Sequence, residues 1–234
     1  MAHSSNKILY DEEFGDIEIR RVKSRLVSIH FQTDGRLVAR LPRFGSTRDV
    51  RRLLDANRSK LKKSLTRIAS KKDYADGDQI GKSHHLRITR DDQESVTLKR
   101  LDIVVTATAD TTSATKSQLI KEGVAKALRK EAKAYLPRRL QYLAERYGFS
   151  YDKVRFAHAK SRWGSCTHRD DLVVISLNIM LMTLPNELID YVLLHELTHI
   201  KNPNHSSEFW ADLERVCSSA KTKRREIKEY SPYL

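Results

Sequence analysis

Three polar residues near the carboxyl end of the sequence have the spacing of a metal-dependent hydrolase. His195, Glu196 and His199 form the pattern H-E-x-x-H. On a helix, side chains four positions apart lie on the same face, so both imidazoles can reach one zinc ion. Glu196 then lies roughly 100° round the helix, beside the metal. From there its carboxylate can accept a proton from a metal-bound water.

A third ligand is needed, and His205 is the natural candidate. Pro203 disfavours helical geometry at Asn202, so Asn202-Pro203-Asn204 is expected to end the helix and let the chain double back. Three protein ligands leave a fourth position for water, as in catalytic zinc sites. The zinc would lower the pKa of that water towards about 7. We therefore predict one catalytic Zn²⁺ per chain; the other six histidines lack comparable spacing.

Two predicted helices must position these residues. An apolar run leads into the first histidine of the pattern, and Pro185 opens the predicted helix. Ser206 and Ser207 suit the start of the next helix, which is expected to run to Val216. The third histidine lies in the short connection between the two helices.

The amino-terminal part of the sequence is predicted to be rich in strands. Alternating apolar residues predict strands at residues 17–20, 26–31 and 36–41. Asp34-Gly35 predicts a tight hairpin turn between the last two strands. From about residue 47, apolar side chains recur at helical spacing while Arg and Lys occupy the other faces, which predicts a basic amphipathic helix.

The middle of the sequence suggests a domain boundary. Short strands are predicted at residues 86–89, 96–99 and 103–105, and later ones at 154–159 and 172–178. A polar stretch at 108–115 precedes a predicted helix at about 116–147, which Pro137 is expected to kink or split. We therefore predict an α+β protein with a β-rich domain at 1–112, basic helix included, and a metallopeptidase domain at 113–234. No internal repeat is evident.

The composition limits the setting in which the protein works. The formal net charge is +14, and residues 1–100 carry 23 basic and 14 acidic side chains. This excess allows attraction to nucleic acid through the amino-terminal portion, although a solvated basic face is the simpler interpretation. No run of about 18 apolar residues is present, so no membrane partner is expected. Two cysteines and the absence of a secretory signal favour the cytoplasm.

Several motifs together resemble the YgjP-like metallopeptidases, which are related to the SprT-like and Wss-type proteases of DNA–protein crosslink repair. They are the run KSRWGSC at 160–166, Leu177-Asn178, the H-E-x-x-H segment, Asn204-His205-Ser206 and Phe209-Trp210. The resemblance implies a minimal zincin-type fold with zinc on the three histidines and Glu196 as catalytic acid/base. It does not name a substrate.

The run at 160–166 has two interpretations. Arg162, Trp163, Ser165 and Cys166 could form a loop beside the cleft that contacts substrate or the oxyanion. Alternatively, the run is a tight turn with Trp163 in the core and Arg162 bonded to backbone carbonyls. The Cys166 thiolate could also ligate zinc in a latent state.

Three further residues are candidates for supporting roles. Asn178 could orient substrate or only cap a strand. Glu208 and Asp212 could each hold a ligand histidine through a hydrogen bond, and spacing does not choose between them.

The sequence is compatible with three functions. The first is hydrolysis of peptide bonds in a protein or peptide substrate by zinc-activated water with Glu196 as general base. The second adds nucleic-acid attachment, giving a protease of the SprT type. The third is a non-catalytic binding module that zinc stabilises, in which removal of the metal would unfold the chain.

Overall fold

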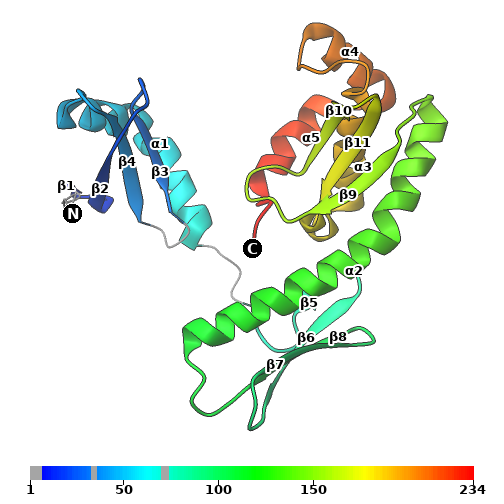
Figure 1. Ribbon diagram of the computed structural model, residues 1–234, viewed down its shortest axis with the longest axis horizontal. Coiled ribbons are helices and arrows are strands. Elements are labelled where there is room, and N and C mark those ends of the chain that lie inside the picture. The colour runs from blue at the N-terminus through cyan, green and yellow to red at the C-terminus, as the bar shows by residue number, and fades with distance from the viewer. Residues whose placement is uncertain (1–6, 33–35, 70–73) are drawn as a thin grey trace. The chain divides into compact units, whose positions relative to one another are not determined.

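The computed structural model describes residues 7–32, 36–69 and 74–234, and it divides the chain into two compact units (Figure 1). The first unit ends at Asp73 and the second begins at Tyr74. No helix among the described residues is long and apolar enough to cross a membrane.

The first unit is a four-stranded sheet with one helix. Its elements are β1 (Lys7–Asp11), β2 (Gly15–Val22), β3 (Ser28–Phe31), β4 (Leu37–Pro42) and α1 (Thr47–Ala69). The strand order is β1-β2-β4-β3, with β2 and β4 parallel and the outer pairs antiparallel.

The core of the first unit explains the alternation of apolar and polar residues in β2. Ile17 and Ile19 of β2 are buried together with Leu37 and Ala39 of β4, and α1 adds apolar residues from one face, including Leu54. The predicted hairpin is confirmed, because β3 and β4 pair with Phe31 opposite Leu37. Its turn, Asp34-Gly35, lies outside the described residues.

The second unit contains two sheets and four helices among its described residues. The first sheet comprises β5 (Gln79–Ile80), β6 (His84–Arg90), β7 (Ser95–Lys99) and β8 (Asp102–Ala107), in the order β5-β6-β8-β7. The second comprises β9 (Lys153–Ala157), β10 (Gly164–Arg169) and β11 (Leu172–Asn178), in the order β10-β11-β9. The helices are α2 (Ser113–Tyr147), α3 (Asn186–Thr198), α4 (Ser207–Val216) and α5 (Ala220–Glu226).

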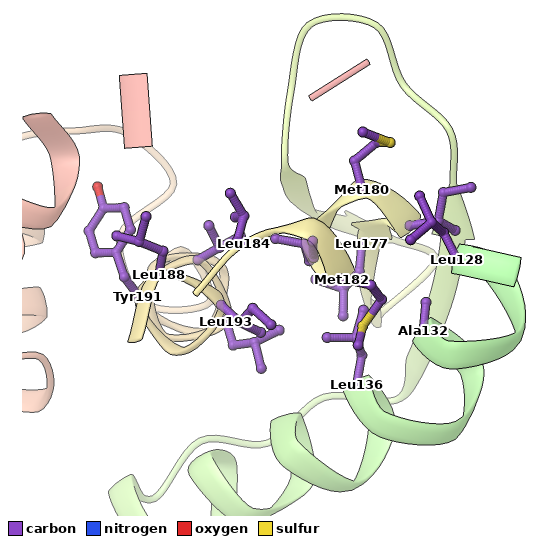
Figure 2. Packing of buried hydrophobic residues seen from close by; sticks show 14 of the residues in the cluster. Leu128, Ala132, Leu136, Leu177, Met180, Met182, Leu184, Leu188, Tyr191 and Leu193 are labelled. Atoms are coloured by element: carbon purple, nitrogen blue, oxygen red, sulfur yellow. The ribbon is translucent and has the colours of Figure 1, made fainter. Parts of the chain in front are cut away.

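Helix α2 joins the two sheets of the second unit, as Figure 1 shows. It contacts β5, β7 and β8, and it also contacts β9, α3 and the short 3-10 helix η1 (Ile179–Thr183). Figure 2 shows Leu128, Ala132 and Leu136 of α2 packed beside Leu177 and Met182. The buried residues of α2 recur every three or four positions, from Ile120 through Leu128 and Leu136 to Ala144, so one continuous face of the helix packs against all of these elements.

Pro137 lies inside α2 without splitting it. The helix is continuous from Ser113 to Tyr147, and Figure 1 shows it bending partway along its length. A proline in a helix interior removes one backbone hydrogen bond and bends the helix, and the packing on both sides keeps the two parts together. The predicted kink is therefore observed, and the predicted split is not.

The two units contain the same ββββα arrangement, which the sequence did not reveal as a repeat. The order β1-β2-β4-β3 matches β5-β6-β8-β7, with the same parallel central pair and antiparallel outer pairs. The following helix contacts the last two strands in both copies. Gly15, the first residue of β2, and Gly81, in the turn before β6, have φ of 66° and 63°. The copies share a topology although their residues differ.

The repeated topology accounts for a difference from the predicted division at 112/113. That boundary falls between β8 and α2, inside the second unit, where the sheet packs on the helix. The polar stretch at 108–115 is a tight connection in which the Thr112 hydroxyl accepts from the Thr115 N–H at 3.2 Å to cap α2. The mixed α+β class is confirmed.

Candidate metal centre

Helix α3 carries His195 and Glu196 in its last turn, and His199 follows directly after its end. Pro185 precedes its first residue, as predicted, and Leu193, Leu194 and Leu197 bury the helix in the core. The helix ends at Thr198, so His199 is its C-cap and keeps right-handed helical geometry. This is four residues before Asn202-Pro203, where the sequence predicted the end.

The chain turns back between α3 and α4 and presents the third histidine. Successive turn hydrogen bonds lead from the end of α3 to Asn202, whose N–H donates to the Thr198 carbonyl at 3.1 Å. Ser206 caps α4 by accepting from the Phe209 N–H at 3.4 Å. The predicted start of α4 is confirmed, and His205 lies in the connection directly before it.

The structure brings the three predicted ligands together. One nitrogen from each of His195, His199 and His205 lies within 4.8 Å of the others. The Nε2 atoms of His195 and His205 are 3.0 Å apart. Nitrogens bound about 2.0–2.1 Å from a tetrahedral zinc would be separated by about 3.3 Å, so this spacing fits one small cation. Among the described residues, no other His, Cys, Asp or Glu joins this group.

Aromatic residues of α4 fix the imidazole rings. Phe209 is fully buried and stacks on His199, with ring centroids 4.5 Å apart. Trp210 stacks on His205 at 6.1 Å, and the Arg224 guanidinium lies 4.5 Å from the Trp210 centroid. Burial, together with the neighbouring histidines and Arg224, lowers the pKa of His195 to about 3. The ring is therefore neutral, which is the form that binds metals.

Hydrogen bonds behind His199 show which of the two acidic residues, Asp212 or Glu208, supports a ligand histidine. His199 Nδ1 lies 2.9 Å from the Asn202 carbonyl, and the Asn202 amide donates to Asp212 at 2.8 Å. The carbonyl favours the tautomer with hydrogen on Nδ1, which leaves Nε2 for a metal. Asp212 thus acts on His199 through Asn202. Glu208 is exposed and interacts with the serines of its own helix start instead.

Glu196 occupies a buried position against strand β10. Its side chain contacts the Gly164 backbone so closely that a Cβ added there would lie 2.6 Å from Glu196 Oε1. Burial raises the pKa of Glu196 to about 8, although the Arg162 charge and the Cys166 N–H act in the opposite direction. The carboxyl group is thus shielded from bulk water beside two histidines.

The run at 160–166 is part loop and part strand, which corrects the prediction of a single loop or turn. Gly164, Ser165 and Cys166 begin β10, which pairs antiparallel with β11. Trp163 is partly buried against the core, as the turn interpretation expected, whereas Arg162 is exposed and acts on Glu196 through its charge. Sequence reasoning missed β10 because its sequence, GSCTHR, begins with a glycine and has no alternation of apolar residues.

Cys166 and Asn178 have roles that the sequence left open. Burial and the nearby Glu196 raise the pKa of Cys166 to about 11, and its sulfur is outside the histidine group. The latent-ligand interpretation is therefore not supported. Asn178 is buried, and its amide donates at 2.9 Å to the carbonyls of Ala159, Arg162 and Pro232. It anchors the loop before β10 and the carboxyl-terminal segment.

Two residues near the site had no signal in the sequence. Gly164 belongs to the KSRWGSC run, but its approach to Glu196 depends on how β10 crosses α3. Arg224 lies in α5 and reaches Trp210 only through the packing of α5 on α3. Neither position follows from residue spacing along the chain.

The fold and the histidine cluster define an α+β protein with a candidate site for one metal ion. The sequence matches the family described as YgjP-like, metallopeptidase domain, over residues 25–230. The chain belongs to this family. The sequence therefore places it among the metallopeptidases, as the motifs suggested.

Solved structures add a weaker likeness. The metallopeptidase zymogen of Pyrococcus abyssi abylysin is 26% identical, with a TM-score of 0.35, covering 40% of this chain and 92% of its own. The zymogen of Methanocaldococcus jannaschii jannalysin is 22% identical, with a TM-score of 0.33, covering 40% and 91%. At these TM-scores the likeness carries no weight for mechanism. No curated protein matches the chain significantly.

Proposed function

We propose that the chain is a zinc-dependent peptidase in which Glu196 is the general base. The observation that carries this proposal is the convergence of three imidazole nitrogens within 4.8 Å, with a buried carboxylate on the residue next to His195. Membership of a metallopeptidase family supports the reaction class. Both cysteines are free, which agrees with the cytoplasmic setting that we also propose.

The donor set fits zinc better than a hard cation. Three neutral imidazoles are ligands typical of zinc, whereas calcium and magnesium prefer oxygen. His195, His199 and His205 would hold one ion. When bound, zinc acts as a Lewis acid that polarises a carbonyl group and makes water more acidic.

Glu196 would carry the proton during hydrolysis. One carboxylate oxygen accepts the proton of the attacking water, and the same oxygen then delivers it to the amine that leaves. Because Glu196 is buried against Gly164, its side chain is held in one orientation and solvent has little access to the proton. Burial raises the pKa of Glu196 and the Arg162 charge opposes this rise; the charge of a bound zinc ion would further favour the ionised carboxylate that this role needs at the start of the reaction.

Strand β10 supports a peptide as the substrate. It lies at the edge of the order β10-β11-β9, and its first residues face Glu196. The backbone groups on an edge strand can pair with an extended peptide, which would then lie across the histidine cluster. The substrate would therefore be an unfolded or extended segment of a protein.

The test compares the wild-type protein with Glu196→Gln. Zinc content measured by elemental analysis is expected to be equal, while cleavage of casein or of a quenched peptide library is expected to fall by at least about 10²-fold. Cleavage by Glu196→Gln at the wild-type rate would refute the mechanism.

A chelator separates the enzyme from a non-catalytic module that zinc stabilises. Removing a catalytic ion is expected to abolish cleavage while the thermal unfolding transition stays cooperative, because the large core packs without the histidines. Loss of the folded circular-dichroism signal at 25 °C on chelation would instead favour the binding module.

A further inference from the structure

One end of the first unit holds a cluster of acidic side chains that pair with cations. Residues 1–73 carry 18 basic and 9 acidic side chains. Four of the acids, Asp11, Glu12, Glu13 and Asp16, lie at or beside the β1–β2 turn. At that end Arg58 forms ion pairs with Asp11 at 3.0 Å and with Glu13 at 3.1 Å.

The opposite end collects basic residues. Strands β2 and β4 are parallel, with Val22 opposite Pro42, so their carboxyl ends meet there. The segment before β3 and the first turn of α1 reach the same end, since Ser28 pairs with Arg40 and α1 begins at Thr47. We call this surface the basic end; it comprises Arg21, Lys23, Arg25, Leu26, Arg43, Phe44 and Arg48.

A braced turn presents one aromatic ring at the basic end. The Arg21 guanidinium donates to the carbonyls of Pro42, Arg43 and Gly45, at 3.1, 2.6 and 3.1 Å. The turn is also packed tightly, because a Cβ on Gly45 would lie 2.8 Å from Leu41 Cδ1. Phe44 is nevertheless 97% exposed. The turn therefore holds an apolar ring in solvent on a fixed backbone.

The cations of the basic end have no acidic partners within the described part of the first unit. No carboxylate there forms an ion pair with Lys23, Arg25, Arg43 or Arg48. The nearest acid in sequence, Asp49, accepts instead from the Ser46 N–H at 2.9 Å. The positive charges are thus available for an anionic ligand.

We propose that the basic end binds single-stranded nucleic acid, with Phe44 stacked on a base and the arginines on phosphates. Guanidinium groups bind phosphate oxygens in pairs, and four of the five cations here are arginines. An exposed aromatic ring beside a cationic surface provides a stacking site for an unpaired base. A protein partner would favour a broad apolar patch, but the large apolar side chains exposed at the basic end are Phe44 and Leu26.

The experiment measures binding of the full-length chain to fluorescent oligonucleotides of about 15 nucleotides. Fluorescence anisotropy is recorded across a salt series. Single-stranded DNA and RNA arms identify the sugar preference, and a duplex of the same length tests the need for unpaired bases. Phe44→Ala is expected to weaken single-strand binding about tenfold. Arg43→Gln with Arg48→Gln is expected to reduce the slope of log K against log salt by about 1.4, since each single-strand phosphate contact contributes about 0.7.

Matched controls separate the basic end from general positive charge. Arg90→Gln with Lys99→Gln removes the same charge from exposed positions of the second unit and is expected to leave binding unchanged. Phe44→Trp is expected to retain affinity. Thermal unfolding of every variant at equal concentration verifies that each one folds.

Three results would overturn the proposal. The first is no binding to any oligonucleotide at low salt. The second is equal loss in the control pair and in the Arg43/Arg48 pair. The third is binding of polyglutamate as tight as that of the oligonucleotides, which would indicate an acidic protein partner. None of these results bears on peptide cleavage, which Glu196→Gln tests separately.

Discussion

Gly164 is the residue where backbone packing limits the geometry of the site most directly. A methyl group at this position would lie 2.6 Å from Glu196 Oε1 and 2.8 Å from its Cγ, so the carboxylate would have to move. Gly164→Ala is therefore expected to lower peptidase activity by about 10²-fold, the scale of a lost general base, with unchanged zinc content. Rates and metal analysis on the same preparation test this.

The control for Gly164→Ala lies on the same strand. His168 is exposed near the far end of β10, and His168→Ala is expected to retain both activity and metal. If Gly164→Ala is as active as this control, the close approach to Glu196 does not matter for catalysis.

The effects of Asp212 and Glu208 on zinc affinity can be compared by substitution. Asp212→Ala removes the partner of Asn202, whose carbonyl faces His199 Nδ1 at 2.9 Å. Removing such an outer partner is expected to weaken zinc affinity about 10–100-fold. Glu208→Ala serves as the control and is expected to change it little, because Glu208 is exposed. Competition with a colorimetric chelator measures both affinities, and a larger effect of Glu208→Ala would contradict this assignment.

The sequence predicted the ligand residues because their geometry is local. Residues 195 and 199 lie one helical turn apart, and a short connection brings His205 to them. The surroundings of Glu196 could not be predicted in the same way. Gly164 reaches the carboxylate from a strand 32 positions earlier in the chain, and only tertiary packing sets that distance.

At the scale of elements, Glu131 connects α2 to the turn before β6. Its carboxylate accepts from the backbone N–H groups of Lys82 and Ser83, at 2.7 and 2.9 Å, and lies 2.7 Å from His84 Nδ1. Glu131→Gln is expected to destabilise the second unit by about 1–3 kcal/mol at pH 7, because the amide cannot accept all of these hydrogen bonds. Thermal or urea unfolding measures the difference.

The pH dependence of this effect follows from the direction of the pKa shift. Burial alone would raise the pKa of Glu131, but hydrogen bonds from His84, Lys82 and Ser83 hold it below its ordinary value of 4.5. A carboxyl group whose pKa is lower in the folded protein stabilises the fold above that ordinary value and loses this contribution as the pH falls. The gap between wild type and Glu131→Gln is therefore expected to narrow between pH 6 and about pH 3.

An exposed carboxylate on the same helix is the control. Glu122 pairs with Lys126 on the surface of α2, so Glu122→Gln is expected to change the stability by less than about 0.5 kcal/mol at any of these pH values. Equal effects of the two substitutions would show that the buried hydrogen bonds of Glu131 contribute nothing specific.

Helices and strands with a strong apolar periodicity could be predicted from the sequence. The elements against which they pack could not. The helix from Thr47 and the hairpin before it agree with the apolar pattern because one face of each meets a single core. The ββββα repeat escaped notice because the two copies keep strand order and turns but not residues. Helix α2 differs from α1 in that its buried face packs against several elements, which residue spacing along the helix does not identify.

At the scale of the whole molecule, the polar stretch at 108–115 marks a helix cap rather than a domain boundary. Composition shows where the chain is solvated, but it does not show whether the segments on either side pack together. Here β8 and α2 belong to one core, which includes Ile103, Val105, Val124 and Leu128. The division between the two units instead falls between Asp73 and Tyr74.

Two fragments test this division directly. Residues 74–234 keep every member of the large core, so this fragment is expected to unfold cooperatively and to bind zinc with the affinity of the full chain. Residues 113–234 lack Ile80, Leu86, Ile103 and Val105, all of them buried, and the α2 face that these residues cover would be exposed to water. Burying side chains of this size contributes about 1.5–3 kcal/mol each, so losing four approaches or exceeds the stability of a typical domain. The shorter fragment is therefore expected to aggregate or to bind a hydrophobic dye, as measured by light scattering and 8-anilinonaphthalene-1-sulfonate fluorescence.

A cooperatively folded 113–234 fragment with full zinc affinity would contradict this expectation. It would place the domain boundary between β8 and α2.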